Sequence, residues 1–443
     1  MRDVIDLFDQ AIFVGERATG MTDVVQYIWL YNRAIDSDAL QQFHCNLKLG
    51  RLSRLIERLP VPFGRHRWVS SDCHTEIEVV SDERDRSEFD HWLEEQAHSP
   101  IDPERGPGWH LALLRFTDGG TGISLVTSHC IVDGTGLNEA LSAAASELGD
   151  ARIWSPRGTR RRLPVALEDT WQTVRELPEI GRAAFATIRR VRSTGDRAPS
   201  AANALTRPIV GPDVCVTMPT ATVFIDARAW DAQAQSLGGT SNTLLAGLAV
   251  RIAERVGRVA ADGSVLLTMP VDERTADDTR GNAVAHLNFT VDPASVTPDL
   301  RELRATIKMA LRLRENTPDE RRALLPIVPL LPQWLVRRIV GVTATSPTSV
   351  NFSNLGTIPA LVARPDGTQA DRFAIMGRYP GMTQKTVHRI GGRLQLVSGR
   401  AGGLVFLTVL SYEPGCPNSD DALRQQVWDS LADFSLEFRA GWQ

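Results

Sequence analysis

Residues 123–136 have the sequence ISLVTSHCIVDGTG, an apolar strand pattern that ends in a histidine. Side chains alternate between the two faces of a strand, so His129 lies on the same face as Ile123 and Leu125. Ser128 lies on the opposite face for the same reason. The pattern therefore predicts that His129 continues a buried face at the point where the strand ends.

The residues after His129 predict a turn followed by a helix. Asp133 and Gly134 form the turn, and the helix covers residues 137–148. Gly134 and Gly136 allow a ligand to approach the backbone closely. A histidine beside the N–H groups of a helix N-terminus combines a general base with an oxyanion site, as acyl transfer requires. The alternative is a purely structural histidine, because an HxxxD pattern alone occurs by chance.

The composition is typical of a soluble globular protein with a large interior. The chain has 443 residues, of which 42% are hydrophobic and 23% charged. This length favours two or three domains. The net charge of -4 is small for the length. It gives no field that would attract nucleic acid, and we expect no nucleic-acid partner.

Neither metal sites nor membrane spans are indicated. The five cysteines are scattered without a CxxC pair, so we expect no bound metal and no disulfide framework. Acidic residues occupy the N-terminal region where a signal peptide would be apolar, and we expect a cytoplasmic location. The apolar run 323–340 belongs to a segment that prolines and two arginines interrupt, so it does not predict a transmembrane helix.

The order of predicted elements divides the chain into two mixed α/β halves. In the first half we expect a helix over 37–58 with Ser37 as N-cap, and a hairpin of strands 110–116 and 121–128. In the second half we expect a helix over 240–257, capped by Thr240 or Ser241, strands at 220–227, 263–274, 348–356, 391–400 and 403–412, and a terminal helix over 419–439. The predicted boundaries are residues 1–175, a connection over 176–216, and residues 217–443.

The segment SHCIVDG, residues 128–134, resembles the HHxxxDG motif of the condensation-domain and CoA-dependent acyltransferase superfamily. That group includes chloramphenicol acetyltransferase, wax-ester/diacylglycerol acyltransferases and polyketide-associated acyltransferases. Segments 100–137, 239–257, 269–291 and 349–359 are similar to further parts of the family in the family's order. The resemblance implies an α/β (α+β) fold of two chloramphenicol-acetyltransferase-like lobes, each a mixed sheet with helices, and a channel between them.

The resemblance also implies roles for individual residues. His129 matches the catalytic histidine, and Ser128 replaces the first histidine of the motif, which points into structure in the family. Asp133 shapes the loop through a salt bridge, for which Arg274 in PVDER matches the family's arginine; the alternative for Arg274 is a solvated surface side chain. Gly134 marks the oxyanion region. We do not expect Cys130 to be a nucleophile.

Two candidate substrate contacts complete the predicted site. Asn354, in FSNLG, either contacts the acyl donor or the oxyanion, or satisfies backbone groups in a turn. Ser128 is the second candidate. Arginines at 160–162, 189–190, 192 and 321–322 either meet the phosphates of coenzyme A or are solvated. The run 323–340, with Trp334, either lines an acyl tunnel, touches a lipid surface peripherally, or packs in the core.

The implied activity is acyl transfer from a CoA or acyl-carrier-protein thioester to an alcohol acceptor, in lipid or natural-product biosynthesis. No tightly bound cofactor is expected; acyl-CoA or a phosphopantetheine thioester is a co-substrate. The partners are a small-molecule acceptor and a carrier protein. One alternative is a freestanding condensation enzyme that forms an amide. Another is a catalytically silent domain that recruits a carrier protein.

Overall fold

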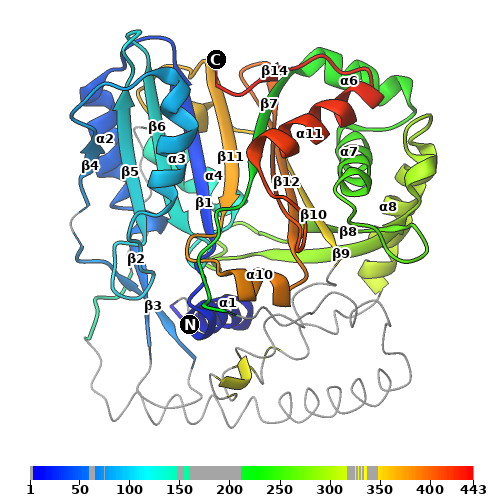
Figure 1. Cartoon of the computed structure of the whole chain (residues 1–443). Coiled ribbons are helices and arrows are strands. Elements are labelled where there is room, and N and C mark those ends of the chain that lie inside the picture. Colours follow the sequence, from blue (N-terminus) through cyan, green and yellow to red (C-terminus); the bar gives the residue numbers. More distant parts are fainter. Residues whose placement is uncertain are drawn as a thin grey trace.

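A computed structural model describes residues 3–58, 65–73, 75–146, 154–158, 211–316, 325, 328, 331, 334–336 and 348–442. Two mixed β-sheets lie side by side, and helices pack against each (Figure 1). The predicted α/β fold of two lobes is confirmed. The arginines at 160–162, 189–190, 192 and 321–322, most of the predicted connection 176–216, and most of the run 323–340 lie outside the described residues.

The first sheet has five strands in the order β11-β1-β6-β5-β4. They are β1 (Val24–Tyr31), β4 (Ile77–Val79), β5 (Trp109–Arg115), β6 (Thr121–Ser128) and β11 (Arg372–Arg378). Strands β5 and β6 form the predicted antiparallel hairpin. Strand β1 was not predicted, although its sequence VVQYIWLY is apolar and rich in strand-forming residues. Strand β11 comes from the second half of the sequence and pairs with β1.

The helices around the first sheet are α1 (Leu7–Thr19), α2 (Ser37–Leu47), α3 (Phe89–Ala97) and α4 (Gly134–Ala144). Two 3-10 turns, η1 (Arg51–Ser53) and η2 (Arg86–Glu88), and a two-stranded sheet of β2 (Arg54–Glu57) and β3 (Arg67–Ser70) lie in the same half of the chain.

The predicted helix over residues 37–58 is longer than the observed helix α2. It ends at Leu47, because the chain turns at Gly50 and residues 54–57 pair with β3. Its N-cap is Asp36, not Ser37, since the Asp36 carboxylate accepts from Asp38 and Ala39.

The second sheet has seven strands in the order β14-β7-β13-β12-β10-β8-β9. They are β7 (Thr220–Asp226), β8 (Val265–Asp272), β9 (Val284–Val291), β10 (Val350–Thr357), β12 (Arg393–Ala401), β13 (Leu404–Tyr412) and β14 (Arg439–Ala440). Five of these strands occupy the predicted segments. The sheet is mixed, because β10 runs parallel to β8 and β12 while most other pairs are antiparallel.

The elements around the second sheet are α6 (Ala227–Ser236), α7 (Ser241–Arg255), α8 (Arg301–Asn316), α10 (Gln384–Arg389) and α11 (Asp420–Asp433), with η3 (Pro293–Ser295) and η5 (Ala360–Ala363). Thr240 caps α7 in a capping box, as predicted. The predicted terminal helix 419–439 ends early, at Asp433. Ser435 has a positive φ of 51°, and Arg439–Ala440 joins the sheet beside β7.

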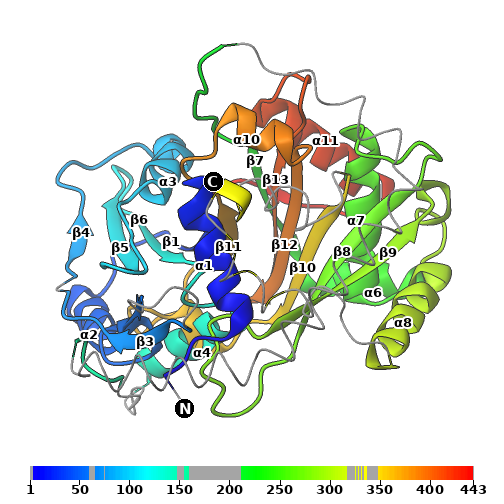
Figure 2. The same cartoon turned by 90° about the horizontal axis from the view of Figure 1, so that it is seen from below.

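Each sheet has its own apolar core. Helix α7 is buried along most of its length, including Leu244, Leu248 and Ile252, and each such side chain contributes about 1.5–3 kcal/mol relative to an exposed one. The core beside the first sheet also contains Phe373 and Phe406 from the second half of the sequence. Seen from below, α1 lies between the two sheets (Figure 2). Among the described residues, no helix combines the length and the apolarity that a bilayer crossing needs.

Candidate active site

His129 follows directly after the last residue of β6. Its neighbours Ser128 and Cys130 are fully buried, whereas His129 is half-buried and so reaches solvent. Both backbone groups of His129 are engaged. Its N–H donates to the carbonyl oxygen of Asp23 at 2.9 Å, and its carbonyl accepts from Nδ2 of Asn282 at 2.9 Å. The backbone that carries the imidazole is therefore fixed on two sides.

Asp133 makes the ion pair with Arg274 that the resemblance implies. Arg274 Nη2 lies 2.7 Å from Asp133 Oδ1, and the two side chains are 2% and 3% exposed. Asp133 also caps α4 by accepting from the N–H of Gly136 at 2.7 Å, and its Oδ2 accepts from the N–H of Ala283 at 2.8 Å. Arg274 is thus not a surface residue. Asp133 joins the His129 loop to the segment between β8 and β9.

The glycines after Asp133 lie close to side chains from other parts of the molecule. Helix α4 begins at Gly134 rather than at 137, so Gly134 and Gly136 belong to its first turn. A Cβ on Gly136 would lie 3.0 Å from Nη2 of Arg274, and one on Gly134 would lie 3.1 Å from the Leu355 side chain. The absent side chains make room for protein groups. The oxyanion role of Gly134 stays a prediction.

The segment between β8 and β9 is anchored in the first half of the molecule by charged side chains. Arg51 donates to the carbonyls of Asp278 and Arg280, and Arg54 donates to that of Thr279. Asp9 on α1 accepts from the N–H of Gly281 at 2.7 Å. Such bonds from charged groups contribute about 1.5–3 kcal/mol each.

Asn282 connects this anchor to His129. Its backbone N–H and its Nδ2 both donate to Asp9 Oδ1, at 2.7 and 2.9 Å, while Nδ2 also donates to the His129 carbonyl. Burial raises the pKa of Asp9 to about 6, although these hydrogen bonds act in the opposite direction. The Gly-Asn pair was part of the resemblance, but no role had been predicted for Asn282.

Two residues next to His129 do not face the same space. Ser128 is fully buried and its hydroxyl accepts from the N–H of Cys130 at 3.2 Å, which favours a structural role; contact between Ser128 and a substrate stays a prediction. The strand alternation explains the difference, because Ser128 points into the core. Burial also raises the pKa of the Cys130 thiol. A neutral, buried thiol is a poor nucleophile.

Asn354 lies in β10, directly before Leu355, whose side chain lies near Gly134. Its Oδ1 accepts from the N–H of Gly356 at 3.0 Å, and Gly356 has a positive φ of 65°. This is the turn-forming role that the sequence left open as one alternative. Contact between Asn354 and an acyl donor stays a prediction. Trp334 is 67% exposed, so core packing is wrong for this side chain.

The charges of three carboxyl groups, those of Glu16, Asp23 and Asp133, interact with His129. Asp23 precedes β1, and its N–H donates to Oε1 of Glu16 on α1 at 2.9 Å. Burial raises the pKa of Glu16 to about 7. Burial also lowers the pKa of His129, but the charges of Asp23 and Asp133 raise it, and the net direction is upward. The imidazole is therefore a stronger base than an isolated histidine.

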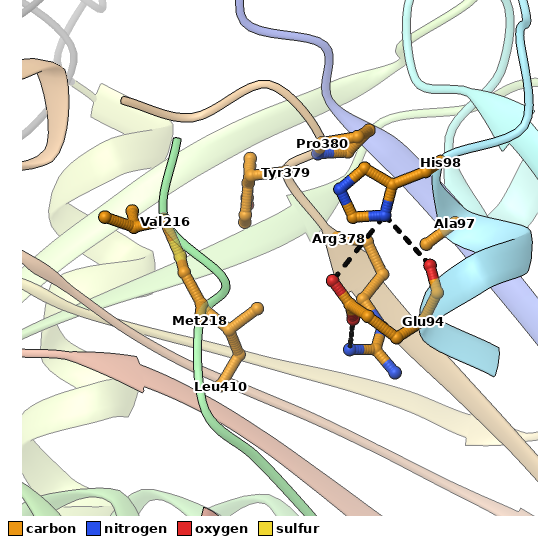
Figure 3. A pocket seen from close by; sticks show the side chains of 9 residues that line it. All are labelled: Glu94, Ala97, His98, Val216, Met218, Arg378, Tyr379, Pro380 and Leu410. Atoms are coloured by element: carbon orange, nitrogen blue, oxygen red, sulfur yellow. Dashed lines mark hydrogen bonds and ion pairs between the residues drawn. The ribbon is translucent and has the colours of Figure 1, made fainter. Parts of the chain in front are cut away.

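A small cavity lies between the two sheets near this cluster. Glu94 and His98 of α3, Arg378 and Tyr379 of β11 and its end, and Met218 are among the side chains around it (Figure 3). Its volume is about 10 Å³, which is room for one water molecule. Glu94 there pairs with Arg378 at 2.5 Å. His129 does not line this cavity.

A second cavity, of about 180 Å³, lies beside β5 and is lined by Lys48, Cys73, Thr75 and Trp109 among others. His129 does not line it either. Within the part of the chain that the structure describes, no group of three or more histidine, cysteine or acidic side chains could hold a metal ion.

Comparison with solved structures identifies proteins that share this fold. No protein-family model matches the sequence, and no curated protein does. Among solved structures, polyketide synthase associated protein 5 from Mycobacterium tuberculosis is 16% identical, with 97% of each chain covered and a TM-score of 0.51. The wax ester synthase/diacylglycerol acyltransferase from Marinobacter aquaeolei VT8 is 14% identical, with 98% of this chain and 100% of that chain covered and a TM-score of 0.55.

The starter condensation domain of rhizomide synthetase RzmA, in complex with C8-CoA, is a third similar structure. It is 12% identical, with 98% of this chain and 94% of that chain covered and a TM-score of 0.54. Identities this low establish the fold and nothing finer. The chain therefore shares the two-lobed fold of these condensation-domain and acyltransferase structures, the fold that the resemblance of the SHCIVDG segment implied.

Proposed function

We propose that the protein transfers an acyl group from a CoA or carrier-protein thioester to an alcohol, with His129 as general base. The observation that carries the proposal is the placement of His129. His129 is half-buried at the end of a buried strand, and its backbone is hydrogen-bonded to both Asp23 and Asn282. The backbone of the imidazole is fixed, and the flanking Ser128 and Cys130 are fully buried, so direct transfer without a covalent intermediate suits this site.

In this reaction the imidazole takes the proton of the acceptor hydroxyl. The acceptor oxygen forms a bond to the thioester carbonyl carbon, and the carbon–sulfur bond then breaks. The leaving thiolate takes the proton back from the imidazolium, so His129 ends the cycle neutral. Asp133 takes no part in proton transfer, because its two oxygens already accept from Arg274, Gly136 and Ala283.

The similar structures support the same class of reaction. One is a wax ester synthase and another was solved with C8-CoA, so both a CoA thioester and ester formation occur on this fold. Amide formation is the second candidate, because a starter condensation domain is also among these structures. The two candidates differ only in the acceptor.

Mass spectrometry of the products tests the proposal. Wild type, His129→Ala and the control His91→Ala are incubated with a panel of acyl thioesters and a mixture of alcohols and amines. His91 is a suitable control because its side chain is 75% exposed on α3. We expect an acyl ester from wild type and His91→Ala, and none from His129→Ala. An amide would favour condensation, and binding of a carrier protein without turnover would favour the recruiting role.

A further inference from the structure

Asp23 lies directly opposite His129 across the β1–β6 strand pair. Val24 is paired with Ser128 in this antiparallel register, and the next step outward brings Asp23 opposite His129. The N–H of His129 donates to the carbonyl of Asp23 at 2.9 Å, as the register requires. Opposed residues in an antiparallel pair project to the same face, with Cβ atoms about 4.5–5.5 Å apart. The register therefore brings Asp23 and His129 to the same face of the sheet, where the charges of their side chains interact.

The residue directly after β11, the other strand paired with β1, also lies next to Asp23. Val24 is also paired with Arg378 of β11, so Tyr379 flanks Asp23 on its other side. Arg393, at the start of β12, lies with its guanidinium carbon 3.9 Å from the centre of the Tyr379 ring. The second sheet thus supplies a cation on the side of Asp23 that faces away from His129.

Arg393 and His129 both favour the ionised form of Asp23. Burial raises the pKa of Asp23 and sets the net upward direction, while the charges of His129 and Arg393 each act to lower it. The pKa of Arg393 is raised in turn, because the attraction of Tyr379 and Asp23 outweighs its burial. The three groups form a line of alternating charge from the second sheet to His129.

The other titratable groups near His129 are hydrogen-bonded, neutral or ion-paired. Glu16 bonds the backbone of Asp23, and burial raises its pKa to about 7. The Cys130 thiol is neutral, because burial raises its pKa well above the ordinary value. Asp133 is paired with Arg274. Glu16 and Asp133 thus each have another partner. Among the described residues, the side-chain oxygens of Asp23 cap no helix and form no ion pair, so Asp23 can act on His129.

We propose that Asp23 is a positioning residue for His129, which orients the imidazole and stabilises the imidazolium that forms during acyl transfer. The inference rests on the proposed function. When His129 takes the acceptor proton, positive charge develops on the ring beside a fixed carboxylate, which lowers the barrier of that step. Asp23 itself gains no proton. The acceptor–carbonyl bond forms, the carbon–sulfur bond breaks and the thiolate recovers the proton from His129.

Titration of the His129 ring by NMR tests the pair without any substrate. The ring pKa is compared in wild type, Asp23→Asn and the control Asp371→Asn, and the His129 signal is identified by its absence from His129→Ala. Asp371 is a matched control, because it lies at the far end of the same β1–β11 strand pair. We expect a lower ring pKa in Asp23→Asn and no change in Asp371→Asn. Equal values in all three proteins would overturn the proposal.

A second measurement covers the case in which Asp23→Asn does not fold. The interaction is reciprocal, so His129→Ala should raise the pKa of the Asp23 carboxyl, followed by its carbon chemical shift. An unchanged Asp23 titration would overturn the proposal equally well. In the kinetic test, Asp23→Asn should lower kcat, leave the KM for the thioester unchanged, and move the acidic limb of the pH profile to lower pH.

These readouts separate the two proposals. If wild type transfers acyl groups but the His129 titration is the same with and without Asp23, the positioning role fails and the acyltransferase function stands. If Asp23 shifts the titration but His129→Ala leaves every detected activity intact, the pair stands and the proposed function fails.

Discussion

Replacing Arg274 by methionine should destabilise the fold by about 3–5 kcal/mol, the cost of leaving one charge of a buried ion pair without its partner. The structure locates that cost. Arg274 donates to the carbonyls of Gly281 and Arg280 as well as to Asp133. Without Arg274, the carbonyl of Gly281 still accepts from the N–H of Asp133, and the carbonyl of Arg280 still accepts from Arg51. The loss therefore falls on the Asp133 carboxylate.

Urea unfolding followed by far-UV circular dichroism measures this effect. The midpoint shift is the lost free energy divided by the slope, so with a slope of about 3 kcal/mol per molar urea the midpoint should fall by about 1–1.7 M. Arg33→Met is the control, because the Arg33–Asp371 pair is 43% and 40% exposed. An exposed pair contributes at most about 1 kcal/mol.

The double variant Arg274→Met/Asp133→Asn isolates the pair itself. Removing both charges leaves no buried carboxylate without its cation, so the double variant should be more stable than the sum of the two single effects predicts. If Arg274→Met lowered the free energy of unfolding no more than Arg33→Met, the view that this pair ties the His129 loop to the segment between β8 and β9 would be refuted.

Three further predictions concern the same region. Gly136→Ala should destabilise the protein by about 1–3 kcal/mol despite the better helix propensity of alanine, because the new Cβ would lie 3.0 Å from Arg274 Nη2; a rise in melting temperature would contradict this. Asn282→Ala should cost about 1–3 kcal/mol, since the carbonyl of His129 and Oδ1 of Asp9 each lose a donor; an unchanged urea midpoint would argue against that role. Burial raises the pKa of Asp9 from 3.8 to about 6, so the native state binds a proton more tightly than the unfolded chain, and this group's contribution to stability is lost as pH rises from about 4 to 6. Wild type should therefore lose melting temperature relative to Asp9→Asn across that window, and parallel curves would be evidence that Asp9 titrates normally.

The residues of the site that belong to recognisable sequence motifs could be predicted from the sequence. The alternation of β6 places His129 and Ser128 on opposite faces, and the PVDER segment supplies the arginine that pairs with Asp133. These predictions depend on spacing within one strand or on an ordered set of family-like segments. Both kinds of information can be read from one sequence without knowing which strands are neighbours in the fold.

The missed residues needed information on which strands are neighbours. Asp23 could not be placed beside His129 because β1 was not predicted, although the run VVQYIWLY, residues 24–31, was a visible signal. Even if β1 had been predicted, its pairing register with β6, about a hundred residues later in the sequence, would not follow from either strand alone. Asn282 was missed for the same reason. Its two partners, Asp9 and the His129 carbonyl, lie far away in the sequence.

The placement of β11 has a consequence for any attempt to divide the protein. Strand β1 pairs with β6 on one side and with β11 on the other, and β11 is contributed by residues 372–378. A fragment that stopped before residue 217 would leave β1 as an open, apolar edge of eight residues with unpaired N–H and C=O groups, the kind of edge that recruits other chains and aggregates. The first half of the molecule is therefore not a unit that could be produced, exchanged or inherited separately from the second.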